Sequence, residues 1–304
     1  MITYPGHGAK SRPAHLKTKD KLYAGAVTPF DWSQIKEDSI GPVPNLFGLF
    51  DRDQDGSGSC TCQATAYGFC YCTKIEINRE DLYSHVHLPG GGAYLNAPLD
   101  FLRNTGPILL SKYPDPNPET EQAMTTIIAV QAGDRIRTFK LSYTYYGTDI
   151  DSAALAITNH NYIHLGVKGS WIKGWEKSWI DPYFSQEDWD HALFAGKESL
   201  VLRNGIPTIK AKSSWCQHFD PEGKQVFCHY LNKSYFDAYG VFEIIGVDIA
   251  ELELMTADEV TKVYVLAFYR APTPDELNYW SGKPLLDFLN TAIKDRANFL
   301  TAHE

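Results

Sequence analysis

Cysteine side chains are concentrated in one short stretch of this chain. Four of the six cysteines lie within residues 60 to 72, namely Cys60, Cys62, Cys70 and Cys72. Their C-x-C-x7-C-x-C spacing lacks the gap of roughly two to four residues that is typical of zinc knuckles. If the stretch is helical, Cys60 and Cys62 point to different faces, which disfavours both a shared metal ion and disulfides within the helix. We therefore expect no metal site here, and at least three of the four to be buried thiols that pack as small apolar side chains.

Cys60 differs from the others in its position. It follows Gly58 and Ser59 at a predicted loop-to-helix transition, where the positive end of the helix lowers the pKa of a thiol and favours a nucleophilic thiolate. Gln54, six residues earlier, could place an amide donor beside the backbone N–H of Cys60 to stabilise an oxyanion. His191, in "EDWDHALFAG", could act as the base that such a thiol needs. Taken alone, a Cys or a His is more often structural, and Gln54 would be a solvated loop residue.

The elements that would position these residues change in character along the chain. Residues 1 to 30 predict an extended arm on the surface, with three prolines and no apolar periodicity. Helices are predicted at 60–73 and 93–104, the second with Leu95, Leu99 and Leu102 on one face and with a loop at 90–92 before it. Residues 134 to 250 are rich in alternating β-branched and aromatic residues, which predicts strands, with one helix at 151–158.

Composition excludes several classes of function. The chain has 43% apolar and 21% charged residues and a net charge of −9, which is typical of a folded protein and argues against nucleic acid as the main partner. No apolar run approaches the length of a membrane span, and we expect no cofactor. The first thirty residues lack the apolar stretch of a signal peptide, so a virion or intracellular location is expected rather than secretion.

Six motifs, in order, resemble the papain-like cysteine peptidases over residues 27 to 245. They are "VTPFDW" as an amino-terminal strand, "QDGSGSC" as the nucleophile motif, "GGGAYLNAPLDFLRNTGPILLSKYP" as the glycine loop with its helix, "DSAALAITNHNYIHLGV", "WDHAL" as the histidine motif and "IKAKSSWC" as the strand that orients the histidine. The resemblance implies an α+β, two-lobed fold, with a helical lobe and an antiparallel, barrel-like β lobe, over residues 31–250.

The resemblance also implies roles for single residues. Cys60 would be the nucleophile, His191 the general base and then acid, Gln54 the oxyanion donor, and Ser213 the residue that orients the histidine. Substrate would be contacted by Gly91, Gly92, Tyr94 and Ala192, while Trp215 would shield His191 from water. The chemistry would be peptide hydrolysis through a thioester, with a Cys–His ion pair formed before substrate arrives.

This sequence departs from the family's pattern at several positions. Ser213 stands where the family has Asn, and Cys216 stands where it has Gly. A serine hydroxyl has a shorter reach than a carboxamide, so we expect weaker orientation of His191 and low activity. Thr61 replaces a Trp and Ser57 replaces a half-cystine, and too few residues precede "FDW" for an inhibitory propeptide of ordinary length. Whether Cys216 pairs with Cys228 is left open by the sequence.

Residues 254–304 predict a small helical module. Thr256 and Glu259 match a capping box, and two apolar stripes follow on either side of "APTP", the first at Val260, Val263, Tyr264, Ala267 and Phe268 and the second at Leu285, Leu289, Ile293, Ala297 and Leu300. "VYVLAFYRAPTPDELNYWSGKPLLDFL" resembles a module of bacterial surface and phage structural proteins. By that resemblance the packing residues would be Tyr269, Arg270, Leu277, Tyr279 and Trp280.

Two hypotheses follow. The first is a cysteine peptidase that cleaves a peptide or protein substrate with Cys60 and His191. The alternative is a structural or adhesive protein of a phage tail or capsid that keeps a degenerate peptidase fold, in which case other subunits of a particle or a cell surface would be its partners. Substrate specificity and oligomeric state do not follow from the sequence.

Overall fold

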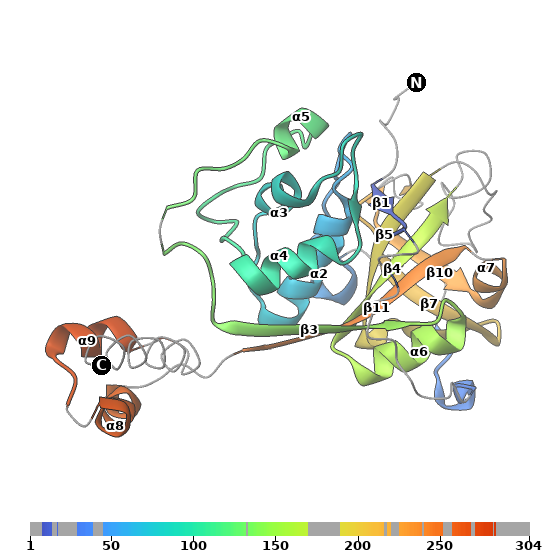
Figure 1. The fold of residues 1–304 in the computed structure, drawn as a ribbon. Coiled ribbons are helices and arrows are strands. Elements are labelled where there is room, and N and C mark those ends of the chain that lie inside the picture. The colour runs from blue at the N-terminus through green and yellow to red at the C-terminus, as the bar shows by residue number, and fades with distance from the viewer. Residues whose placement is uncertain are drawn as a thin grey trace. The chain divides into compact units, whose positions relative to one another are not determined.

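The chain is described by a computed structural model over residues 8–13, 17, 29–38, 45–131, 133–169, 189–215, 218–219, 225–238, 240–251, 257–268, 271–281 and 283. Figure 1 shows the arrangement of the helices and strands. The helices are α2 (Cys60–Thr73), α3 (Arg79–Val86), α4 (Ala97–Thr105), α5 (Glu121–Met124), α6 (Ile150–Asn159), α7 (Lys233–Asp237), α8 (Ala257–Phe268) and α9 (Pro274–Trp280). The strands are β1 (Ala9–Lys10), β2 (Ala93–Tyr94), β3 (Phe139–Tyr146), β4 (Tyr162–Gly169), β5 (Trp189–Gly196), β6 (Leu200–Arg203), β7 (Ile206–Lys212), β8 (His218–Phe219), β9 (Gln225–Val226), β10 (Cys228–Asn232) and β11 (Val241–Glu251).

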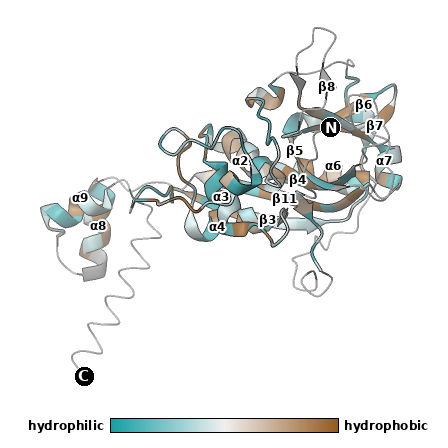
Figure 2. Cartoon of the chain, turned by 90° about the horizontal axis from the view of Figure 1, so that it is seen from above, coloured by the Kyte–Doolittle hydropathy of each residue, from teal (hydrophilic) through white to brown (hydrophobic). Residues whose placement is uncertain are grey.

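The chain divides into two compact units. One comprises residues 1–136 and 141–249, and the other comprises residues 137–140 and 250–304. Within the larger unit, helices α2 to α5 gather on one side and strands β4, β5, β7 and β10 on the other, with β1 beside β5 (Figure 1). The view from above also shows α2, α3 and α4 on one side of this unit and β4, β5 and β7 on the other (Figure 2).

The helical part is built around α2, whose first ten residues are all buried. Leu95, Leu99 and Leu102 are at most 1% exposed, so the apolar face predicted for α4 is confirmed. The helix itself begins at Ala97, because Ala93 and Tyr94 form the short strand β2. Pro98 in its first turn and Gly106 just after its end, at φ +81°, are the residues that begin and terminate a helix of this kind.

The strands form a seven-stranded sheet in the order β10-β7-β5-β4-β11-β3, with β6 paired to β7. Strands β4 and β5 are antiparallel, with Gly166 opposite Ala192 and Val167 opposite His191. Helix α6 packs on this sheet, and its Ala153, Ala156 and Ile157 are buried against sheet residues such as Leu165 and Ile209. The α+β fold with a helical part and an antiparallel β part is thereby confirmed.

One local prediction differs from the structure, and one segment without a prediction forms a helix. Residues Arg79–Val86 form α3, and Asn78 caps this helix by accepting from the Asp81 N–H. The strand expected at "VTPFDW" does not appear in its described residues, where Trp32–Gln34 form a 3-10 helix instead. Strands β6 and β10 lie within residues 134 to 250, the range in which strands were predicted.

Helices α8 and α9 form their own small core of Val260, Tyr264 and Trp280, with Val263 and Leu277 packed against it. Leu277 and Trp280 therefore pack as expected, whereas the expectation for Tyr279 is wrong, since its side chain is 60% exposed. A capping box does begin a helix here, at Thr273 and Glu276 of α9. Some residues of this module lie outside the described part of the chain, namely Thr256, Tyr269, Arg270 and the stripe from Leu285 to Leu300. Cys216 of the larger unit also lies outside it.

None of the helices in the described part of the chain is both long enough and apolar enough to cross a membrane.

Candidate active site

Cys60 is the first residue of α2 and lies beside strand β5. The backbone N–H groups of Ala192, the residue after His191, and of Thr61 lie near its sulfur and act to lower its pKa. Close packing positions this helix end: a Cβ on Gly58 would lie 2.6 Å from the backbone nitrogen of Gly92, so only glycine fits there. The fold therefore brings Cys60 to the histidine-bearing strand, as the motif order predicted.

His191 is held between two residues of the segment that follows β7. Its Nε2 lies 3.0 Å from the Ser213 hydroxyl oxygen, and that oxygen also accepts the Trp215 backbone N–H at 3.0 Å. The imidazole stacks on the Trp215 ring, with centroids 5.0 Å apart and an interplanar angle of 17°. Ser213 and Trp215 therefore both contact the imidazole, while their roles in orienting and covering it remain predictions. A carboxamide oxygen can only accept from Nε2–H, whereas a hydroxyl can also donate, so Ser213 constrains the imidazole tautomer less than Asn would.

Gln54 links the loop before α2 to the same segment. Its Nε2 donates to the Ser57 carbonyl at 2.8 Å, its Oε1 accepts from the Ser214 hydroxyl at 2.5 Å, and its backbone N–H donates to the Ser214 carbonyl at 2.9 Å. The side chain is 1% exposed, so it is not a solvated loop residue. Its carboxamide is fixed in orientation, which is what an oxyanion donor requires.

The glycine loop is tied to the nucleophile loop by a residue that sequence reasoning missed. Glu121 of α5 accepts the Gly58 N–H at 2.6 Å and the Tyr83 hydroxyl at 2.7 Å, and that hydroxyl accepts the Gly92 N–H at 2.7 Å. The Gly92 carbonyl is also used within the loop, by the Leu88 N–H. No motif signals Glu121, because its role depends on contacts with Tyr83 and Gly58, which lie 38 and 63 positions away. Substrate pairing by Gly91 and Gly92 remains a prediction.

The amino-terminal arm lies over the Cys60 thiol. A Cβ on Gly8 would lie 2.3 Å from the Cys60 sulfur, and Ala9 and Cys60 are both 0% exposed. Strand β1 pairs in parallel with β2, with Ala9 opposite Ala93 and Lys10 opposite Tyr94, and the Ala93 N–H donates to the Gly8 carbonyl at 2.8 Å. Arg12 is 7% exposed and contacts Glu243. The expectation of an arm on the surface is therefore wrong for these residues.

This burial reverses the expected electrostatics of the thiol and the imidazole. Burial raises the pKa of Cys60 to about 12, against the smaller lowering by the N–H groups of Ala192 and Thr61. Burial also lowers the pKa of His191 to about 3. The predicted thiolate–imidazolium pair is thus disfavoured while residues 8–12 cover the site, because neither charged form is solvated.

The other cysteines of α2 only partly match their prediction. Cys62 is fully buried, as expected of a small core residue, but Cys70 and Cys72 are half-buried near the end of the helix. In the described ranges no group of three or more His, Cys, Asp or Glu side chains is arranged to hold a metal ion.

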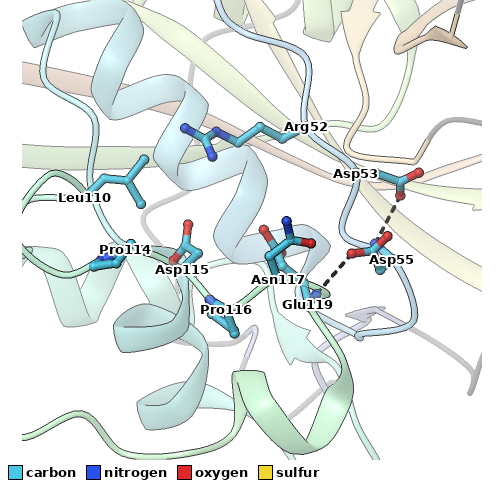
Figure 3. Close-up of a pocket in the computed structure, with 9 residues that line it drawn as sticks. All are labelled: Arg52, Asp53, Asp55, Leu110, Pro114, Asp115, Pro116, Asn117 and Glu119. Atoms are coloured by element: carbon cyan, nitrogen blue, oxygen red, sulfur yellow. Dashed lines mark hydrogen bonds between the residues drawn. The ribbon is translucent and has the colours of Figure 1, made fainter.

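A separate pocket of about 500 Å³ lies on the helical part of the larger unit, and Figure 3 shows its lining. Its acidic residues include Asp53, Asp55, Asp115 and Glu119. Asp55 links the wall, because it donates its N–H to Asp53 and accepts the Glu119 N–H, each at 3.0 Å (Figure 3). Burial, then repulsion by Asp115, raises the pKa of Glu119 to about 8, and burial raises the pKa of Asp53 to about 6.

The raised pKa of Glu119 predicts a loss of stability with rising pH. The folded state binds this proton more tightly than the unfolded state, so the stabilisation is complete below the unfolded pKa near 4.5 and is lost as the pH rises to about 8. In this window the slope of unfolding free energy is at most about 1.4 kcal/mol per pH unit. Glu119→Gln should flatten this decline in urea unfolding measured at pH 5 and pH 8. The exposed carboxylate Asp237 provides the control as Asp237→Asn, and equal slopes for wild type and Glu119→Gln would contradict the prediction.

Comparison of the sequence with protein-family models finds no match, and comparison with curated proteins finds none either. Solved structures do match. Xylellain, a cysteine protease from Xylella fastidiosa, has a TM-score of 0.54 at 15% identity, covering 81% of this chain and 96% of that one. Digestive procathepsin L 3 of the Tenebrio molitor larval midgut has a TM-score of 0.52 at 12% identity, covering 81% and 76%. The ragweed pollen allergen Amb a 11, a cysteine protease solved in its proform, has a TM-score of 0.51 at 14% identity, covering 81% and 74%. The chain therefore has the two-lobed fold of the papain-like cysteine proteases.

Proposed function

We propose that this chain is a cysteine peptidase that hydrolyses peptide bonds through a thioester on Cys60. The observation that supports this most is the position of the Cys60 sulfur beside the backbone of Ala192, next to a His191 whose Nε2 is held by Ser213 and whose ring is stacked on Trp215. A thiol, an imidazole and a residue that orients the imidazole are the parts that nucleophilic catalysis needs.

The reaction would proceed by acyl transfer. Nδ1 of His191 would take the thiol proton as the sulfur attacks the peptide carbonyl carbon, and Gln54 together with the Cys60 N–H would stabilise the oxyanion. Collapse of this intermediate would break the C–N bond, with the imidazolium giving its proton to the leaving amine. Water would then attack the thioester, giving a proton to His191, and the departing sulfur would recover that proton.

Turnover requires that residues 8–12 leave the thiol. With Gly8 over the sulfur and Cys60 fully buried, a substrate carbonyl has no access. Uncovering the site would also remove the main cause of the raised Cys60 pKa, which is burial. The helix end and the two N–H groups near the sulfur would then favour the thiolate.

The test is labelling with an epoxide thiol trap under reducing conditions, followed by peptide mapping, together with hydrolysis of a casein-derived peptide mixture. We expect slow modification of Cys60 in the native chain and faster modification in Arg12→Ala, whose arm has lost its anchor. Cys60→Ala is the control for selectivity, because Cys70 and Cys72 are the half-buried competitors. If both chains are folded and neither is modified at Cys60 nor cleaves any peptide, the proposal is wrong.

A second candidate is a papain-like fold without turnover. The burial of both Cys60 and His191, with the pKa of each shifted toward its neutral form, favours it. Membership of a phage particle or a cell-surface assembly would accompany this candidate and stays a prediction from the residue pattern of 254–304. The labelling experiment separates the two candidates, because a fold without turnover gives no hydrolysis even when the arm is released.

A further inference from the structure

We propose that Tyr83 and Glu121 are positioning residues, which fix strand β2 relative to the Cys60 thiol and so align a peptide for attack by the sulfur. This inference rests on the proposed peptidase function and assigns to it two residues outside the reacting groups. The hydrogen-bonded chain that runs from Gly58 through Glu121 and Tyr83 to Gly92 is called the Tyr83–Glu121 link.

The Tyr83–Glu121 link consists of three short hydrogen bonds. Each carboxylate oxygen of Glu121 has its own donor, since Oε2 accepts the Gly58 N–H at 2.6 Å and Oε1 accepts the Tyr83 hydroxyl at 2.7 Å. The Tyr83 oxygen in turn accepts the Gly92 N–H at 2.7 Å. Hydrogen bonds to an ionised acceptor are roughly twice as strong as those between neutral groups. Tyr83 is 0% exposed, so water does not compete for its hydroxyl.

Both ends of the link lie beside the parts that must meet in the reaction. Gly58 stands two residues before Cys60, and Gly92 directly precedes β2. A Cβ on Gly58 would lie 2.6 Å from both the Gly92 nitrogen and the Tyr83 hydroxyl oxygen, so the two loops are in contact at this point. The Ala93 N–H of β2 donates to the arm that covers the sulfur. A chain paired with β2 is therefore placed relative to the thiol through the contact that the link holds.

The chemical groups of the link cannot be exchanged for close relatives. Burial, and then the hydrogen bond to Glu121, raises the pKa of Tyr83, so the phenol keeps the proton that it donates. Phenylalanine at this position would remove the acceptor of the Gly92 N–H and one donor to Glu121. Both partners of the Glu121 carboxylate are donors, whereas a carboxamide offers one oxygen and one NH₂ group, so glutamine would set a donor against a donor. Tyr83→Phe and Glu121→Gln therefore open the link with little change in side-chain volume.

A kinetic experiment tests positioning. Both variants are made in the full chain carrying Arg12→Ala, and kcat and KM are measured with a fluorogenic peptide that this chain cleaves. We expect kcat to fall by about 10- to 10²-fold with little change in KM, because small displacements of the reacting groups slow the chemical step. The double variant Tyr83→Phe/Glu121→Gln should lose little more than either single variant, since each change opens the same link. Losses that multiply, or an effect on KM alone, would overturn the proposal.

The chain offers a matched control for this experiment. The Tyr71 hydroxyl donates to Glu198 at 2.9 Å and accepts the Lys197 N–H at 3.2 Å, which repeats the arrangement of phenol, carboxylate and backbone N–H away from Cys60. Tyr71→Phe and Glu198→Gln should leave kcat unchanged. Melting temperatures of all four variants show whether the folds are equally stable. An equal fall of kcat in the controls would mean that the Tyr83–Glu121 link has no special part in alignment.

Two thiol traps separate this inference from the peptidase function. A peptidyl vinyl sulfone reports on the alignment of a bound peptide, whereas iodoacetamide needs only an accessible thiol. In the Arg12→Ala chain, Tyr83→Phe should slow modification of Cys60 by the peptidyl trap by about 10-fold or more and leave the rate with iodoacetamide unchanged. If this ratio falls while no peptide is hydrolysed, the peptidase function is wrong and the link stands. An unchanged ratio sinks the link, whether or not peptides are cleaved, and failure of both traps to modify Cys60 in Arg12→Ala overturns both proposals.

Discussion

Replacement of His191 by glutamine is expected to reduce peptide hydrolysis by on the order of 10⁴-fold or more, because a carboxamide cannot take the thiol proton and return it to the leaving amine. Glutamine keeps a polar group near the Ser213 hydroxyl and keeps part of the volume under Trp215. The melting temperature should therefore change little compared with the change in rate. The effect is measured by comparing initial rates of peptide hydrolysis with and without His191→Gln, both in the native chain and in Arg12→Ala.

Ser213→Ala is the matched test of orientation. It leaves the histidine in place and removes the oxygen that contacts both Nε2 and the Trp215 N–H. We expect a smaller loss than for His191→Gln, with about 10⁴-fold as its upper bound. The pH profile should also change, because a base that is held less firmly samples the wrong tautomer. Retention of more than a tenth of the activity by His191→Gln would contradict the assignment of His191 as the base.

Replacement of Asp115 by alanine is expected to lower the free energy of unfolding by about 3 to 5 kcal/mol. The Asp115 carboxylate accepts from Arg79 Nη1 at 2.8 Å and from the backbone N–H groups of Arg79 and Glu80 at 2.6 and 3.1 Å. The two side chains of the ion pair are 3% and 5% exposed, so alanine leaves the guanidinium buried without this partner. It also removes the anion at the amino end of α3, where the helix dipole favours negative charge.

Urea unfolding at neutral pH measures this loss. The control is Asp237→Ala, which breaks an ion pair with Lys233 whose side chains are 59% and 54% exposed. Exposed pairs of this kind contribute about 0 to 1 kcal/mol. If Asp115→Ala costs no more than Asp237→Ala, the buried ion pair with Arg79 is not what stabilises this end of α3.

Local sequence pattern was enough to predict the elements that carry the candidate site. Helix α2 begins at Cys60 as expected, and β5 carries His191, because helix ends and alternating apolar residues leave short-range signals. The order of the motifs then predicted that Cys60 and His191 lie in neighbouring elements. The short helix α5 carries no such signal, and Glu121 was missed with it.

The burial of the site and the resulting pKa of Cys60 could not be predicted in the same way. The expected lowering of the Cys60 pKa considered only the helix end, a local effect, whereas burial under Gly8 is a contact between residues 52 positions apart. The arm has no apolar periodicity, so nothing within it signals a buried strand. Its position depends on pairing with Ala93 and on the contact between Arg12 and Glu243, and neither is visible in the arm's own residues.

The contact between Arg12 and Glu243 joins residues 231 positions apart, and this separation has a consequence for synthesis on the ribosome. The arm is made first, but its anchor on β11 emerges only when most of the chain has been translated. Because a domain generally folds as a unit, the cover over Cys60 can be fastened only after β11 has emerged. The thiol is therefore covered late in biogenesis, and a chain truncated before residue 243 would present it uncovered.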